Sequence, residues 1–214
     1  MNIERTPGRY GAIAPNGDHW PLNKANYSFY HLAVLYSTVQ GEGRLAGTPM
    51  TIVRLQGCPI GCFFCDTPET WDPDAGSPDR WHAETIATHC RALPPVWALV
   101  TGGEPCWHDL GALTSALSRQ GIKRALETSG AYPITGQWNW VCISLKPAGL
   151  RPLDRWNLRA ANEIKWLIGR EADVIALEAF LVVHAELLSR SSKLLSQPSV
   201  AVSIQPLSCA AKPT

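Results

Sequence analysis

The sequence is poor in charge and in long hydrophobic runs, and each shortage excludes a class of protein. Charged residues make up only 17% of the 214 residues, the formal net charge is +1, and Lys and Arg are scattered along the chain. Scattered basic residues form no positive face, so we expect no binding of nucleic acid. No apolar run approaches the length of a membrane span, and residues 1–20 lack the apolar core of a signal peptide. We therefore expect a cytoplasmic protein without a membrane segment.

The remaining composition is that of a folded domain. Hydrophobic residues make up 45% of the chain, which is enough for a substantial core at this length. Residues 1–30 show little apolar periodicity and are expected to be an N-terminal extension, whereas residues 31–214 are expected to form one domain.

Strand-like and helix-like segments alternate along the domain. The strand candidates are residues 32–36, 51–55, 96–100, 123–126, 140–144, 163–168 and 200–204. The helix candidates are residues 81–93, 109–120 and 173–188, with Asp109 as the N-cap and Gly121 as the C-terminal stop of the second. Residues 68–79 are rich in Pro and Gly and are expected to be a loop. Strands spaced by helices indicate an α/β fold of parallel βα units.

Cysteine is distributed unevenly. Three of the seven cysteines fall within eight residues, and the others stand alone at Cys90, Cys106, Cys142 and Cys209. An odd count without paired spacing does not suggest a disulfide framework. In a reducing compartment clustered cysteines indicate a metal site, whereas isolated ones are ordinary small buried side chains.

The clustered cysteines, Cys58, Cys62 and Cys65, have the spacing Cys-x3-Cys-x2-Cys, which suits an iron–sulfur cubane. Each thiolate can bind one iron, which leaves a fourth iron without a protein ligand. Such an open corner can take an exogenous chelator, as a catalytic metal keeps one coordination position free. The neighbouring Phe63 and Phe64 are expected to exclude water from the cluster.

A structural zinc site is the alternative interpretation of these cysteines. Zinc takes four ligands, which structural sites usually draw as two spaced pairs. The sequence offers no second pair, because Cys90 falls in an expected helix and His82 and His89 are isolated. The pattern therefore favours an iron–sulfur cluster.

Polar and glycine residues follow one expected strand after another. In barrels and open α/β sheets the C-terminal ends of the strands form the rim where ligands bind. A Gly-Gly pair after one strand is often only a turn, but four such segments beside a cysteine loop indicate an enzyme. The segments are Thr101-Gly102-Gly103-Glu104-Pro105, Glu127-Thr128-Ser129-Gly130, Ser144-Leu145-Lys146-Pro147 and Ser203-Ile204-Gln205-Pro206.

The cysteine spacing followed by Gly-Gly-Glu resembles the radical S-adenosylmethionine (SAM) superfamily. The resemblance implies the radical SAM core, a partial (open) TIM-type barrel of parallel βα units. It also implies a [4Fe–4S] cluster on Cys58, Cys62 and Cys65 whose open iron is chelated by SAM. An electron donor such as flavodoxin or ferredoxin would then allow SAM to be cleaved to methionine and a 5′-deoxyadenosyl radical.

A closer resemblance, over roughly residues 32–208, is to the 7-carboxy-7-deazaguanine synthase family. It implies a homodimeric carbon–nitrogen lyase of queuosine and deazapurine biosynthesis that uses SAM and Mg2+. The substrate, 6-carboxy-5,6,7,8-tetrahydropterin, would lose ammonia to give 7-carboxy-7-deazaguanine. The segments that carry the resemblance are Val39–Gly43, Gly47-Thr48-Pro49, Val53–Cys58, Cys65-Asp66-Thr67, Thr101–Pro105, Glu127–Gly130, Asn162–Lys165 and Gln205-Pro206.

The resemblance also implies which residues bind each group. The SAM-binding residues would be Gly102, Gly103, Glu127, Ser129, Ser144, Leu145, Lys146 and Gln205. The pterin-binding residues would be Val39, Gln40, Gly41, Arg54 and Thr101, and Thr67 would contact Mg2+. Arg54 is chemically suited to clamp a carboxylate bidentately. A lone Thr is acceptable for Mg2+, which keeps several waters and takes few protein ligands.

The sequence departs from this family at both ends. Relatives usually continue for some tens of residues past Gln-Pro, whereas here only residues 207–214 follow. We therefore expect a barrel that is shortened at the C-terminus or completed differently, for example by a partner subunit. The extension at residues 1–30 has no counterpart in the family pattern.

Two other functions share parts of the pattern. A glycyl-radical activating enzyme has the same cysteine spacing and Gly-Gly-Glu, but acts on a protein backbone and has no need of Arg54 or of residues 40–43 to recognise a pterin. A non-catalytic zinc or iron–sulfur scaffold would need only the cysteines.

Overall fold

The computed structural model describes residues 26–75, 80–146, 153, 157–194 and 200–206. The strands are β1 (Phe29–Val39), β2 (Pro49–Leu55), β3 (Arg80–His82), β4 (Trp97–Gly102), β5 (Lys123–Thr128), β6 (Trp140–Ser144), β7 (Glu163–Ile168) and β8 (Ala201–Pro206). The α-helices are α1 (Ala83–Ala92), α2 (Gly111–Arg119) and α3 (Glu171–Leu194), and the 3-10 helices are η1 (Pro68–Thr70), η2 (Pro105–Trp107) and η3 (Asn157–Arg159).

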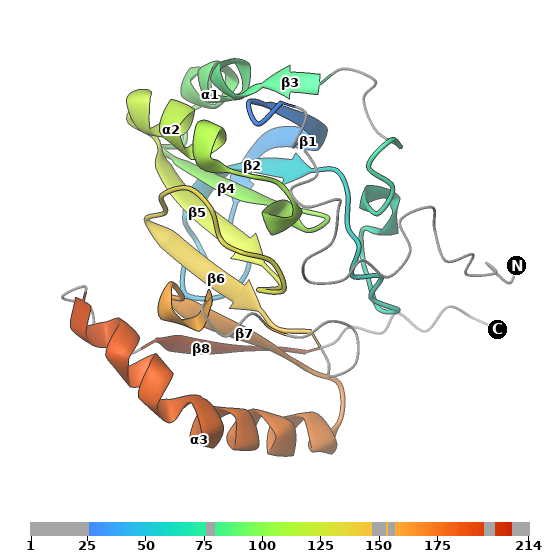
Figure 1. The fold of residues 1–214 in the computed structure, drawn as a ribbon, viewed down its shortest axis with the longest axis vertical. Coiled ribbons are helices and arrows are strands. Elements are labelled where there is room, and N and C mark those ends of the chain that lie inside the picture. Colours follow the sequence, from blue (N-terminus) through green and yellow to red (C-terminus); the bar gives the residue numbers. More distant parts are fainter. Residues whose placement is uncertain (1–25, 76–79, 147–152, 154–156, 195–199, 207–214) are drawn as a thin grey trace, which may run out of the picture.

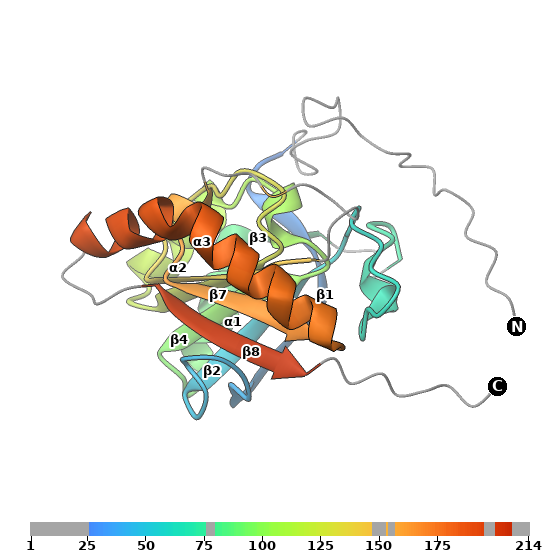
Figure 2. The ribbon, with the colours of Figure 1, turned by 90° about the horizontal axis from the view of Figure 1, so that it is seen from below.

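The strands form one curved sheet in the order β3-β1-β2-β4-β5-β6-β7-β8 (Figures 1 and 2). Strands β2, β4, β5, β6, β7 and β8 run parallel to one another, whereas β1 is antiparallel to both β2 and β3. Among the described residues the two edge strands, β3 and β8, are not paired with each other, so the sheet stays open. The expected α/β fold of a partial barrel is confirmed.

Alternate residues of the central strands are buried on opposite faces of the sheet. Val53, Val100 and Leu126 belong to the main core, which also includes buried residues of α1 and α2. Leu99 and Ala125 belong to a smaller cluster that also contains Met50 and Ile52. Burial on both faces explains why these strands are continuous apolar runs in the sequence.

Two expected helices begin later than their periodicity indicates. Trp81 lies in β3, which pairs with β1, and the His82 ring accepts a hydrogen bond from the Glu84 amide (3.3 Å) where α1 begins. Helix α2 begins at Gly111, and Asp109 Oδ1 accepts the Gly111 amide (2.8 Å) just before it. Gly121 ends α2 with a φ of 72°, as expected of a C-terminal glycine.

Helices do not separate all of the strands, contrary to expectation. The connection between β5 and β6 contains no helix, and that between β6 and β7 contains only η3 among its described residues. The buried side chain of Asn157 holds the first connection instead. Its amide donates to the carbonyls of Gly130 (3.0 Å) and Tyr132 (2.7 Å) and accepts the Ile134 amide (3.3 Å).

The expected boundary near residue 30 falls inside β1. That strand begins at Phe29, and Tyr30 is fully buried. Most of the expected extension (residues 1–25) and residues 207–214, where a shortened C-terminus is expected, lie outside the described residues. Among the described helices, none combines the length and the hydropathy needed to cross a bilayer.

Replacing Asn157 with Ala should destabilise the protein by roughly 2–4 kcal/mol, because two buried carbonyls and one amide lose their partner together. Urea unfolding at an unchanged m-value measures the loss. The matched control is Asn139→Ala, since Asn139 is exposed and its side chain accepts only the Arg124 amide. Equal losses in the two variants would contradict the assigned role of Asn157.

Candidate functional site

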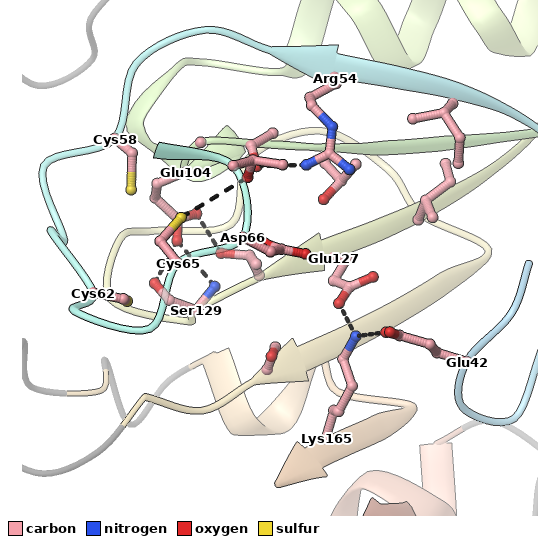
Figure 3. A pocket seen from close by; sticks show the side chains of 18 of the residues that line it. Glu42, Arg54, Cys58, Cys62, Cys65, Asp66, Glu104, Glu127, Ser129 and Lys165 are labelled. Carbon is pink, nitrogen blue, oxygen red and sulfur yellow. Dashed lines mark hydrogen bonds and ion pairs between the residues drawn. The ribbon is translucent and has the colours of Figure 1, made fainter. Parts of the chain in front are cut away.

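A pocket of about 440 Å³ lies where the parallel strands meet the cysteine loop (Figure 3). Its wall brings together almost every site residue expected from the sequence, from segments that are far apart in the chain. These are Val39, Gln40, Gly41, Arg54, Cys58, Cys62, Cys65, Thr67, Thr101, Gly102, Gly103, Glu127, Ser129, Ser144, Lys146 and Gln205. Leu145 is the exception, because its side chain is buried in the main core.

The cysteine loop is closed at its neck by Gln56, the residue that follows β2. The buried Gln56 amide donates to the carbonyls of Glu69 and Asp72, both at 2.7 Å. Beside it, the amides of Gly57 and Cys58 donate to the carbonyls of Thr70 (2.8 Å) and Trp71 (3.0 Å). The two ends of the loop are therefore held together while the cysteines between them face the pocket.

His108 holds the same neck from the side of the core. Its Nε2 lies 2.9 Å from the Gln56 carbonyl, and Nε2–H donates to it. Burial lowers the pKa of His108 to about 4, so the ring is neutral near pH 7. His108 therefore supports the loop without adding charge to the core.

Two of the three cysteine thiols of the loop, Cys58 and Cys62, lie in an environment that disfavours free thiolates. Burial, and then the Glu104 carboxylate, raise the pKa of Cys58 to about 12. Burial also raises the pKa of Cys62, although Lys146 opposes the rise. The Cys65 sulfur accepts a hydrogen bond from the Trp71 indole N–H at 3.3 Å.

This donor set fits an iron–sulfur cubane. None of the six described cysteines is in a disulfide, and the three in the loop line one pocket. A cubane spreads its thiolates over separate irons and is tuned by hydrogen bonds to sulfur, such as the one from Trp71. A structural zinc ion would need four ligands around one point, whereas the loop supplies three cysteines to this pocket.

The two phenylalanines of the loop behave differently from each other. Phe64 lines the pocket and packs on the core, as expected for a residue that excludes water. Phe63 is 68% exposed, so the expectation that it shields the cluster is wrong. Phe63 meets Phe64 only edge to face, on the outer side of the loop.

Gly102 and Gly103 are glycines because the cysteine loop approaches their backbone closely. A Cβ on Gly102 would overlap the Leu55 carbonyl oxygen, and a Cβ on Gly103 would overlap the Gly57 carbonyl oxygen. The Gly103 amide donates to Leu55 O (3.1 Å) and the Glu104 amide to Gly57 O (2.9 Å). The pair thus joins the end of β4 to the start of the cysteine loop, in addition to lining the pocket.

Glu104 organises the neighbouring strand end. Its buried carboxylate accepts the amides of Cys106 (3.0 Å) and Ser129 (2.9 Å) and the hydroxyls of Thr128 and Ser129. Four donors offset the cost of burying a carboxylate. Ser129, expected to bind SAM, is therefore held in place by Glu104.

Other expected ligands keep hydrogen-bonding capacity on the pocket wall. Arg54 donates one Nη1–H to the Gly102 carbonyl (3.1 Å), which fixes the guanidinium beside the pocket. The Thr67 hydroxyl caps no helix and lies 3.9 Å from the Cys65 sulfur. The Lys146 ammonium donates to the Ser144 hydroxyl at 3.1 Å.

Lys165 and Glu42 are functional-site candidates that the sequence reasoning missed. The Lys165 ammonium forms ion pairs with Glu127 and Glu42 (2.8 Å to the latter), and the Gln205 amide also donates to Glu42. Lys165 and Glu42 belong to segments that carried the family resemblance, but neither was assigned a role. A Lys in an apolar strand (EIKWLI) was the available signal, because a buried Lys needs a charged partner.

The chain is similar in sequence to 7-carboxy-7-deazaguanine synthases. It is 39% identical to the synthase of Synechocystis sp. over 153 residues, which cover 72% of this chain and 72% of that protein. It is 36% identical to the synthase of Escherichia coli K12 over 174 residues, which cover 71% of this chain and 78% of that protein. A comparison with protein-family models finds no match.

The fold is similar to the crystal structure of QueE from Escherichia coli. The TM-score is 0.67 at 27% sequence identity, and the likeness covers 86% of this chain and 97% of that one. Together with the sequence relatives, this likeness favours a synthase over a glycyl-radical activating enzyme or a scaffold.

His108 should make stability depend on pH. Its pKa of about 4 in the folded protein lies below the value near 6.5 of an unfolded chain. Above pH 6.5 both states are neutral and the contribution is complete; as the pH falls from about 6.5 to about 4 the unfolded state binds the proton first, and roughly 3 kcal/mol is lost. His108→Gln, which keeps a donor for Gln56, should remove that part of the loss.

The measurement is urea unfolding of both proteins at pH 7.5 and pH 4.5. Other groups that titrate are common to both proteins, so the difference between them isolates His108. Identical losses on acidification would show that the ring is not held neutral in the fold.

Proposed function

The chain belongs to the 7-carboxy-7-deazaguanine synthase family, and we propose that it converts 6-carboxy-5,6,7,8-tetrahydropterin to 7-carboxy-7-deazaguanine with loss of ammonia. The product would enter the biosynthesis of queuosine or other deazapurines. One observation carries the proposal: a single pocket contains three free cysteines, a Gly-Gly-Glu strand end and the guanidinium of Arg54. The first two suit a radical SAM cofactor, and the third suits a carboxylate substrate.

In this proposal Cys58, Cys62 and Cys65 hold a [4Fe–4S] cluster, and SAM lies along the strand ends. The SAM-binding residues are Gly102, Gly103, Glu127, Ser129, Ser144, Lys146 and Gln205, with Leu145 as a contact through its backbone. The Thr67 hydroxyl contributes one ligand to Mg2+, which needs few from the protein. When bound, the cluster and SAM would supply the one-electron chemistry that removes a hydrogen atom from the substrate.

The residues of the chain position the substrate for that chemistry. Arg54 is fixed by the Gly102 carbonyl through one N–H, which leaves other N–H groups of its guanidinium for the substrate carboxylate. Val39, Gln40, Gly41 and Thr101 line the same pocket and would contact the pterin ring. A carboxylate held at Arg54 would place the ring between the cysteine loop and the residues that follow β1.

Two further parts of the proposal concern partners. Reduction of the cluster requires an electron donor, for which a flavodoxin or ferredoxin is chemically suitable. We propose a homodimer as the functional unit, in line with the family resemblance.

Turnover under anaerobic conditions tests the proposed reaction. Reconstituted protein with SAM, Mg2+, dithionite and the carboxypterin should yield 7-carboxy-7-deazaguanine, identified by its mass. Arg54→Met should lower kcat/KM by about a hundredfold or more, because a buried charge-assisted bidentate pair is lost. Absence of the product from the wild-type protein, with its cluster intact, would refute the assignment.

The cysteines should separate into two classes. Cys62→Ala should lose most of its iron and its cleavage of SAM, because a cubane needs all three thiolates. Cys90→Ala should keep both, because Cys90 is buried in α1 among apolar side chains. Iron analysis and absorption spectra of anaerobically purified protein provide the comparison. Equal iron loss in both variants would contradict this division of the cysteines into two classes.

A further inference from the structure

We propose that Lys165 and Glu163, on β7, are positioning residues that fix the wall of the substrate pocket. They would do so by anchoring residues 40–48, the hairpin tip that joins β1 to β2. The proposal rests on the proposed function, because it concerns where the tip presents Gln40 and Gly41 to the pterin. Both residues lie on β7, outside the cysteine loop.

The hairpin tip has hydrogen bonds of its own, but these join the tip only to itself. The Gln40 amide donates to Thr48 O (2.9 Å), the Gly47 amide to Gln40 O (2.8 Å), the Thr48 amide to Leu45 O (3.0 Å) and the Ala46 amide to Gly43 O (3.2 Å). Val39, Gln40, Gly41 and Glu42 line the pocket, and both Gly41 and Glu42 are exposed. A solvent-exposed turn of this kind needs contacts from outside to hold a single position.

Glu163 supplies one anchor through its buried carboxylate. Oε1 accepts the Arg44 amide (3.0 Å), and Oε2 accepts the Trp140 indole N–H (3.2 Å). Gly43 packs so closely on this carboxylate that a Cβ there would overlap Oε1, and its φ of +67° already favours glycine. The tip is thus attached by its backbone to the first residue of β7.

Lys165 supplies the second anchor, two residues further along the same strand. Its side chain is 5% exposed, and its ammonium joins Glu42 of the tip to Glu127 of β5. The Gln205 amide, from β8, donates to the other oxygen of Glu42. Figure 3 shows this ion-pair network on the side of the pocket opposite the cysteine loop.

The charge balance explains why the network is held firmly. Burial lowers the pKa of Lys165, but Glu127 and Glu42 together more than compensate, and its pKa is raised overall. Lys165 therefore stays charged, and removing it would leave Glu127 beside a mostly buried site without its cation. A cavity of about 20 Å³ lies between the tip and the sheet and has room for one water and little more. Its lining includes Glu42, Glu127, Glu163 and Lys165.

Hydrogen exchange of the hairpin tip tests the proposal on the full chain without substrate. In Lys165→Met and in Glu42→Ala, amides of residues 40–48 should exchange about tenfold faster or more, because an anchor is lost. Peptides from β4, which makes none of the ion pairs of Lys165, should exchange as in the wild type. Lys146→Met is the matched control: it removes a pocket lysine bonded to Ser144 rather than to the tip, and should leave tip exchange unchanged.

Glu42→Ala keeps the test decisive if Lys165→Met unfolds, since Glu42 is exposed and its loss leaves the Lys165–Glu127 pair intact. Wild-type exchange of the tip in Glu42→Ala would overturn the proposal. Adding the carboxypterin to the wild type should slow exchange of the tip. If the variants behave as expected but the pterin protects no residue, the proposed function fails while the anchoring role stands.

Discussion

The site depends on the junction where β2 ends and the cysteine loop begins. Here the backbone of Leu55–Cys58 lies against Gly102 and Gly103 on one side and against Glu69–Asp72 on the other. Backbone can approach backbone this closely only where no Cβ intervenes. The buried Gln56 amide then joins the start of the loop to its end by donating to the carbonyls of Glu69 and Asp72. Backbone hydrogen bonds and the Gln56 amide close the neck of the loop. The three cysteines are therefore not needed to hold the loop together and would be available to bind a cluster.

The closed loop holds Cys58 and Cys62 where their thiolates are disfavoured, and a bound cluster would offset that cost. Burial and the Glu104 carboxylate make thiolates unfavourable at Cys58, and burial does so at Cys62. Glu104 is needed at this position, because three of its four donors come from Thr128 and Ser129 at the end of β5. The positive charge of a bound iron–sulfur core would offset this cost of deprotonating the two thiols.

Sequence patterns were sufficient where local chemistry decides structure. The apolar runs of β4 to β7, the Gly121 stop and the cysteine spacing all depend on residues close together in the chain. The patterns failed where distant residues decide. The pattern around Trp81 and His82 predicts a helix, but in the structure both residues pair with β1 as a strand. The connection between β5 and β6 has no helix and is held by the Asn157 amide, which donates to Gly130 and Tyr132. Sequence periodicity does not reveal such hydrogen bonds. Lys165 was overlooked because its partners lie on a hairpin and a strand far from it in sequence.

Because the sheet is open, one side of the pocket has no strand among the described residues to form its wall. In this chain the hairpin tip forms that wall. The cysteine loop is fixed by the hydrogen bonds at its neck. The tip is also closed by bonds between Gln40, Gly47 and Thr48, but β7 and β8 hold it at the pocket. The two walls therefore differ in kind: one is set by backbone packing, the other by buried charge. Both walls are thus held in place, and the wall that would contact the pterin owes its position to Lys165 and Glu163 of β7.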